Sequence, residues 1–167
     1  MLAVLLIVAK WLGLLGMVAA GVIGFCIGDT VSLRTHYLIG LLSSMLFALA
    51  QVMTIYYFVG MRNALRRACT KHGLSDDVAA LALTIKRSVS GRGYILSLLA
   101  TVTMIMAGGA LFGRMPAWVH YSLAILTIIG GVYTGAIEFG AFRRNADLFE
   151  RTAALIDCPP AGESGGE

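Results

Sequence analysis

Charged residues are scarce in this sequence. Only 13% of its 167 residues are Asp, Glu, Lys or Arg, whereas soluble domains carry roughly 25%. Hydrophobic residues make up 58% of the chain, and the mean hydropathy is +0.82. This composition excludes an ordinary soluble domain, and it predicts an all-α, polytopic membrane protein.

Cysteines are few as well, and the common catalytic motifs are absent from the sequence. The three cysteines, Cys26, Cys69 and Cys158, are odd in number and far apart, so they imply no disulfide framework. Cys69 and His72 are three residues apart, but sharing a metal with Cys158 would need a ligand from a distant tail, so we expect no metal centre there. The sequence has no Gly-rich phosphate loop, no nucleophile elbow, no paired carboxylates and no His-Glu-x-x-His motif. We therefore expect no catalytic residues and a protein that is not an enzyme.

Long apolar stretches, in contrast, are abundant. Four of them cover residues 2–28, 36–60, 94–113 and 117–142. Each is long enough to cross a hydrocarbon core of about 30 Å at about 1.5 Å per residue. Together with a hydrophilic loop over residues 61–93, they predict a four-helix transmembrane domain over residues 1–144, built as two hairpins. The tail over residues 145–167 is expected to be disordered from about residue 157.

Lys10 stands inside the first apolar stretch, which is an expensive place for a charge. A long Lys side chain can reach the headgroup region while its methylene stem stays in the apolar layer. We therefore expect Lys10 to snorkel to the nearer membrane surface. The alternative is a buried pair with a carboxylate.

The loop over residues 61–93 predicts a further helix from about residue 76 to residue 89. Ser75 is a suitable N-cap, acidic residues follow in the first turn, and basic residues occupy the last turn. One face of this helix is apolar and carries Val78, Leu81, Ala82 and Ile85. We expect an amphipathic helix that ends at residues 90–93 and lies on the membrane surface or against the ends of the spanning helices.

Basic residues are distributed unevenly between the two sides of the predicted bundle. The loop over residues 61–93 holds seven Lys and Arg and the tail from Arg143 holds three, whereas the two short turns hold one each, Arg34 and Arg114. Cytoplasmic segments carry an excess of Lys and Arg, so this asymmetry predicts that both termini and the long loop are cytoplasmic. The net charge of +4 therefore indicates topology and contact with anionic lipid, not nucleic-acid binding.

Polar and small residues in two of the apolar stretches recur at steps of three and four, which places them on one face of a helix. The stripe of the second stretch is His36, Gly40, Ser43, Phe47, Gln51, Thr54 and Phe58. The stripe of the fourth is His120, Ala124, Thr127, Gly131, Thr134 and Glu138. Unpaired polar groups that face lipid cost several kcal/mol each. We therefore expect the two stripes to face each other, with His36 and His120 at the same depth.

The two halves of the chain also resemble each other. His-Tyr opens both striped stretches, at residues 36–37 and 120–121, and each stretch ends in Phe and Gly followed by Arg-Asn-Ala. An even number of crossings separates them, so they would be parallel hairpin repeats. Coincidence is the alternative, because His-Tyr at an interface and Arg after a spanning helix are both common.

Three hypotheses for the polar residues stay open. Hydrogen bonds across helices would hold the bundle in register, with about 0.6–2 kcal/mol per contact. His36 and His120 would form a ligand pair for a b-type haem, or for copper or zinc. Gln51, Thr134 and Glu138 would line a path or pocket for a proton, an ion or a quinone headgroup.

The segments THYLIGLL, YYFVG and AGGALFGRMPAWVH resemble those of a group of bacterial four-helix inner-membrane proteins to which no activity is attached. The resemblance spans residues 35–144 and implies the fold and a bacterial inner-membrane location. We expect a non-enzymatic integral subunit in contact with lipid, packed in a homo-oligomer or in a larger, electron-transferring membrane complex. The alternatives are an electron carrier that binds haem b or a metal through His36 and His120, and a small transporter or quinone-binding protein.

Overall fold

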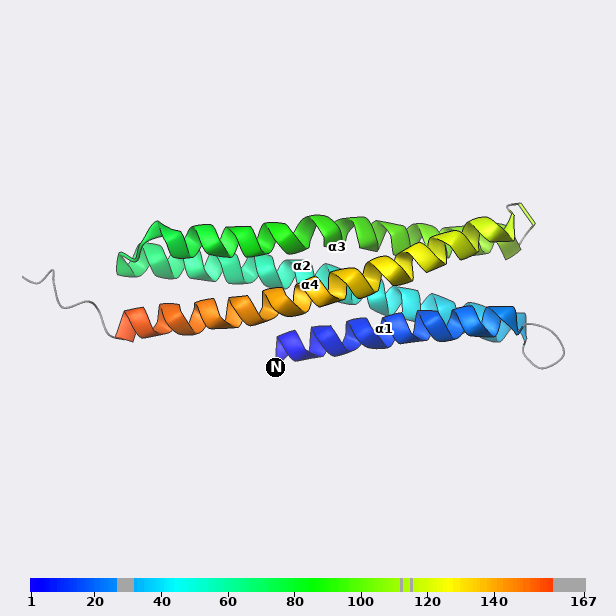
Figure 1. Ribbon diagram of the computed structural model, residues 1–167, viewed down its shortest axis with the longest axis horizontal. Helices are drawn as coiled ribbons and strands as arrows, with labels where there is room; N and C mark the ends of the chain where they lie inside the picture. The colour runs from blue at the N-terminus through cyan, green and yellow to red at the C-terminus, as the bar shows by residue number, and fades with distance from the viewer. Residues whose placement is uncertain (27–31, 112, 115, 158–167) are drawn as a thin grey trace, which may run out of the picture.

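Four helices make up the computed structural model of the chain (Figure 1). They are α1 (Leu2–Phe25), α2 (Leu33–His72), α3 (Asp76–Leu111) and α4 (Ala117–Asp157). The structure describes residues 1–26, 32–111, 113–114 and 116–157. Within these ranges the fold is all-helical, as the composition predicts. The end of the first apolar stretch at residue 28, Cys158 and the tail expected to be disordered lie outside the described residues.

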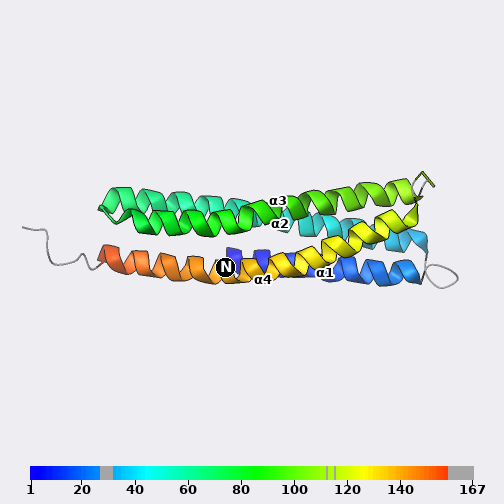
Figure 2. The same ribbon diagram turned by 45° about the horizontal axis from the view of Figure 1, so that its top comes forward.

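All four helices are long and apolar enough to cross a membrane, which makes the chain a multi-pass membrane protein. α1 has 24 residues, whereas α2, α3 and α4 have 40, 36 and 41. At about 1.5 Å per residue, the three longer helices extend well beyond a hydrocarbon core of about 30 Å. α1 runs beside one half of the bundle only (Figures 1 and 2). The other half is therefore an extension made of three helices.

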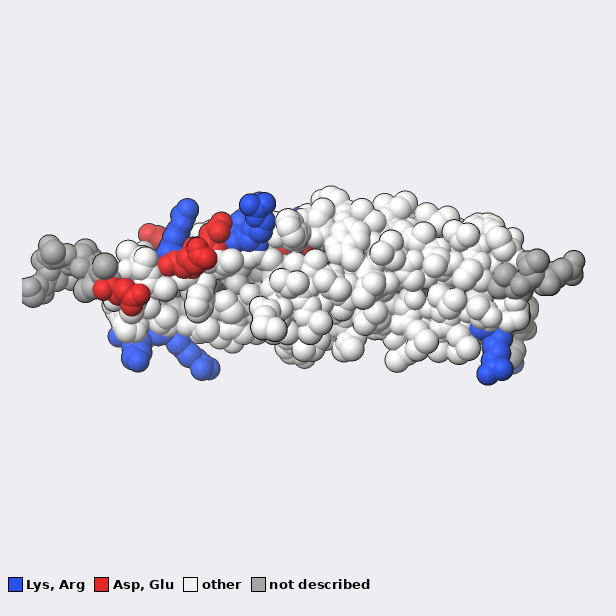
Figure 3. Space-filling model, turned by 90° about the horizontal axis from the view of Figure 1, so that it is seen from below, with Lys and Arg blue, Asp and Glu red and all other residues white. Residues whose placement is uncertain are grey.

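Charge follows this division of the bundle. Figure 3 shows the Lys, Arg, Asp and Glu side chains gathered over the three-helix half, while the half that contains α1 is almost free of charge on that face up to its far end. Large apolar side chains such as Leu5, Leu42 and Leu98 are 64–66% exposed on the uncharged half. In a membrane protein such side chains contact lipid, so the uncharged half is the one that spans the membrane.

Consecutive helices pack along one another, and α1 also packs on α4, so α2 and α4 lie diagonally across the core (Figure 2). Two apolar clusters fill the interior. The cluster in the membrane half is built from Leu14, Met17, Phe47, Leu96 and Ala100. The other cluster continues into the three-helix extension and includes Leu6, Phe58, Leu65, Ile85, Val89 and Phe142.

The turn between α2 and α3 follows the signals in the sequence. Gly73 ends α2 in the left-handed conformation with a φ of 64°, which is available to glycine without steric cost. The hydroxyl of Ser75 accepts a hydrogen bond of 3.2 Å from the backbone N–H of Asp77, so Ser75 caps α3 as expected.

The expected end of this helix at residues 90–93 is wrong. α3 continues without a break from Asp76 to Leu111, so the predicted amphipathic helix is its first half and packs against α2 and α4. Gly93 is needed for close packing rather than for a turn, because a Cβ atom there would lie 2.6 Å from Nε2 of Gln51 and 3.1 Å from the side chain of Ile55. Ala82 and Ile85 are buried as expected, but Leu81 is 49% exposed.

Candidate functional site

The polar stripes of α2 and α4 meet along the diagonal of the bundle. The rings of His36 and His120 have their centroids 6.4 Å apart, at an interplanar angle of 86°. Phe47 packs on Gly131. A Cβ atom at position 131 would lie 3.2 Å from the ring of Phe47. Both residues stand 11 positions after their histidine, so the two helices meet in the same register at this level.

A third contact keeps the same register. Phe58 and Phe142, which both stand 22 positions after their histidine, have ring centroids 4.9 Å apart. The contacts between α2 and α4 therefore keep one register from the histidines to these two rings.

Two of the four stripe hydroxyls form hydrogen bonds within their own helix. Thr54 donates to the carbonyl of Ala50 at 2.8 Å, and Thr127 donates to the carbonyl of Leu123 at 2.8 Å. Thr127 also lies 3.0 Å from the hydroxyl of Thr103 on α3, a partner that the stripes did not reveal. Of the two remaining hydroxyls, Thr134 is buried and Ser43 lies against Gly16 of α1.

A buried charged cluster joins three helices further along α2 and α4 than the histidines. Nζ of Lys10 on α1 forms an ion pair with Oε2 of Glu138 on α4. Nε2 of Gln51 on α2 donates a hydrogen bond of 2.6 Å to Oε1 of the same carboxylate. All three residues are 0–3% exposed. The glycine at position 93 lets α3 approach at this level as well.

The expectation that Lys10 snorkels is therefore wrong, and the alternative of a buried pair is correct. The reason is the position of Glu138, which is enclosed by the bundle and would carry an uncompensated charge without a cation beside it. In this cluster Lys10 and Gln51 occupy both oxygens of the carboxylate. Along α1 and α2, Leu14 and Phe47 lie between this cluster and the histidines. The cluster thus links side chains of α1, α2 and α4.

The histidine pair lines a cavity of about 120 Å³ at the end of the bundle where α2 and α4 begin. Its wall is mostly apolar, and the side chains with polar or polarisable atoms that line it include Met17, His36, Tyr37, Met104, His120 and Tyr121. Tyr121 also stacks on Phe25 of α1, with ring centroids 5.7 Å apart. The cavity thus lies between all four helices.

One hydrogen bond orients the ring of His36. Its Nδ1 lies 2.8 Å from the backbone carbonyl of Ala20, and since a carbonyl can only accept, Nδ1 must carry the proton. Nε2 of a neutral His36 then has a free lone pair. The absence of a side chain at Gly24 makes room for this ring, because a Cβ atom there would lie 2.9 Å from Cε1 of His36.

In His120, unlike in His36, Nδ1 is the nitrogen that lacks a hydrogen-bond partner in the described residues. This nitrogen is buried, and the ring lies next to the backbone of Thr103. A buried nitrogen without a partner costs about 1–3 kcal/mol, so it marks a position where a ligand atom would be favourable. The two histidines together therefore offer two nitrogens that have no hydrogen-bond partner in the described part of the chain.

Neither of the two cysteines that the structure describes lines this cavity. Cys69 is buried in the three-helix extension, far along α2 from His36, and Cys26 is exposed. In the described ranges, no group of three or more His, Cys, Asp or Glu is placed to hold a metal ion. A metal at the histidine pair would have to take its other ligands from a different residue type.

The fold and the site define a multi-pass four-helix bundle with a buried ion pair near one end of its membrane half and a histidine-lined cavity at the other. No family model matches the sequence, and no curated protein and no solved structure matches it at a significant level. The bacterial group that the sequence resembles therefore stays an expectation.

Proposed function

We propose that this chain is a non-enzymatic integral membrane protein that binds a small ligand between His36 and His120. The observation that carries the proposal is the meeting of two imidazoles from α2 and α4, with centroids 6.4 Å apart, in the wall of one cavity. One nitrogen of His120 is buried without a partner, and the one hydrogen bond of the His36 side chain in the described residues leaves Nε2 unused. In its unprotonated form, each of these nitrogens can coordinate a metal ion or accept a hydrogen bond.

The size of the cavity favours a small ligand over a haem. Cofactor pockets measure roughly 300–1,000 Å³, whereas this cavity measures about 120 Å³. A haem between the two rings would require α2 and α4 to separate. A single ion, or a small group that donates a hydrogen bond, fits the cavity without such a movement. The carbonyls of an oxidised quinone only accept hydrogen bonds, so they would not satisfy the lone pair on His36.

The asymmetry of ten Lys and Arg against two supports an orientation with both termini and the three-helix extension in the cytoplasm, in a bacterial inner membrane. The histidine cavity then opens near the outer surface. The exposed apolar surface of the membrane half supports packing in lipid with further copies or other subunits, as part of a homo-oligomer or a larger complex.

The test is to purify the protein in mild detergent from its native membrane and to measure metal content, absorption spectrum and solvent-extractable small molecules. We expect a ligand that copurifies in stoichiometric amount with the wild type and is lost from His36→Ala and from His120→Ala. His72→Ala is the matched control, because His72 is exposed at the far end of α2. A wild type that carries no metal, no chromophore and no small molecule would overturn the proposal, and a Soret band would identify haem as the ligand.

A further inference from the structure

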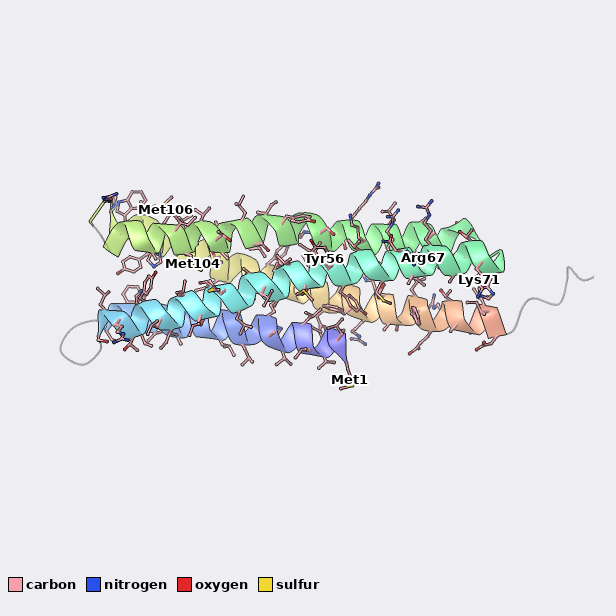
Figure 4. All side chains as sticks on the ribbon, turned by 180° about the vertical axis from the view of Figure 1, so that it is seen from behind. Met1, Tyr56, Arg67, Lys71, Met104 and Met106 are labelled. Carbon is pink, nitrogen blue, oxygen red and sulfur yellow. The ribbon has the colours of Figure 1, made fainter. Side chains whose placement is uncertain are left out.

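Two methionine sulfurs border the histidine cavity in addition to the imidazoles. Met17 of α1 is 6% exposed, and Met104 of α3 is half-buried. Figure 4 shows Met104 on the side of α3 that faces α1 and α2, whereas Met106 lies on the opposite side of the same helix. The cavity thus receives one side chain with a nitrogen or sulfur donor from each helix: Met17, His36, Met104 and His120.

The chemistry of these four side chains selects among metal ions. Thioether sulfur is a soft ligand that favours Cu(I), and neutral imidazole binds copper readily. Hard cations such as Mg²⁺ and Ca²⁺ need several oxygen ligands, and structural zinc sites use Cys, His or carboxylate. Among the residues that the structure describes, no carboxylate lines the cavity, and the buried carboxylate of Glu138 is already occupied by Lys10 and Gln51.

The charge of the ion matters as well. The free-energy cost of moving an ion from water into an apolar environment is large, and in the Born description it rises with the square of the charge. Four neutral ligands bring no negative charge to offset a divalent ion in this largely apolar cavity. A monovalent ion carries a quarter of that cost, so it is the ion that this set of ligands suits.

The hydrogen bond from His36 to the carbonyl of Ala20 is of the kind that orients a metal-binding histidine. Metal-binding histidines commonly donate their other ring N–H to a backbone carbonyl or a carboxylate, which fixes the tautomer and the direction of the ring. Nδ1 of His36 makes such a bond to Ala20, and Nδ1 of His120 is the nitrogen without a partner. Nε2 of His36 and Nδ1 of His120 are therefore the two nitrogens available for coordination.

We infer that the site binds one Cu(I) ion through His36 and His120, with the thioethers of Met17 and Met104 completing the coordination. This inference rests on the function proposed above and specifies its ligand. The ion is bound in its reduced state, and the assignment involves no electron-transfer step.

The experiment is an anaerobic titration of the detergent-purified full chain with Cu(I), in competition with a chromophoric Cu(I) chelator. We expect one ion per chain, and X-ray absorption of the complex should show both nitrogen and sulfur neighbours. Met104→Leu and Met17→Leu should each weaken the affinity about tenfold or more and reduce the sulfur contribution. Met106→Leu and Met45→Leu are the matched controls, because Met106 lies on the other side of α3 and Met45 is 55% exposed on α2. Both controls should bind as the wild type does.

A parallel titration with Zn(II) separates the two proposals. Zinc binding that depends on His36 and His120, with no Cu(I) binding, would overturn copper and leave the proposed function standing. Cu(I) binding that is the same in both methionine variants and shows no sulfur neighbour would overturn the thioether ligands. If His36→Ala and His120→Ala bind Cu(I) as tightly as the wild type, the copper assignment is wrong. If the ligand copurified from the native membrane also survives both substitutions, the proposed function is wrong as well.

Discussion

Lys10 and Glu138, which are 128 residues apart in the sequence, form an ion pair in the interior of the bundle. Gln51 donates to the second oxygen of Glu138 at 2.6 Å, while its own Oε1 is buried and has no partner in the described part of the chain. A buried pair of this kind contributes little net stability compared with apolar residues of the same size, but breaking it is costly. We therefore expect the pair to specify which helices are neighbours more than it strengthens the fold.

Lys10→Met tests this relationship. Removal of the cation leaves the charge of Glu138 buried, so we expect the free energy of unfolding to fall by about 3–5 kcal/mol, measured by denaturation in mixed micelles. In the double variant Lys10→Met, Glu138→Leu both charges are absent, and most of that loss should be recovered. Lys71→Met at the exposed end of α2 is the control and should change the stability by about 0.5 kcal/mol or less. Equal losses in the single and the double variant would show that the pair does not form.

Gly93→Ala tests the close approach of α3 to Gln51. The new Cβ atom would lie 2.6 Å from Nε2 of Gln51 and 3.1 Å from Ile55, so we expect a loss of about 1–3 kcal/mol in the free energy of unfolding. Gly91→Ala, two residues earlier on the same helix, meets no atom within 4 Å. That control should be neutral or more stable by up to about 1 kcal/mol, because Ala favours a helix over Gly. A destabilised control with a stable Gly93→Ala variant would contradict the continuous α3.

The packing of the three-helix extension is tested by a pair of aspartate substitutions. Ile85 is 4% exposed, so Ile85→Asp buries a charge and should lower the free energy of unfolding by about 3 kcal/mol or more. Leu81 lies one turn before Ile85 and is 49% exposed, so Leu81→Asp should cost about 1 kcal/mol or less. Hydrogen exchange over residues 76–92 reports the same contrast. Similar exchange in the two variants would mean that α3 lies on the membrane rather than against α2 and α4.

The orientation in the membrane is tested by cysteine labelling in a background from which the three native cysteines have been removed. A cysteine at position 80 should react with a membrane-impermeant probe only after the cells are opened, because the three-helix extension is expected in the cytoplasm. A cysteine at position 114, in the turn between α3 and α4, should react in intact cells. Labelling of position 80 from outside would reverse the orientation and place the histidine cavity at the inner surface.

Local patterns predicted much of this fold. Apolar length identified four membrane-crossing helices because a helix must satisfy its own backbone hydrogen bonds in lipid over a known thickness. The cap at Ser75 and the turn at Gly73 were readable because they depend on only a few adjacent residues. The steps of three and four placed His36 and Gln51 on one face of α2, since a helix has a fixed number of residues per turn.

Neighbouring helices and their rotation, in contrast, were decided only by the tertiary structure. Gly93 appears as a helix end in the sequence, and only the position of Gln51 on α2 shows that it is a packing contact. Lys10 has a carboxylate partner only because α1 lies against α4. Met17 and Met104 line one cavity with the histidines only because the four helices pack around it. Spacing along the chain carries no information about such contacts, since they depend on which faces the four helices turn toward one another when the apolar clusters pack.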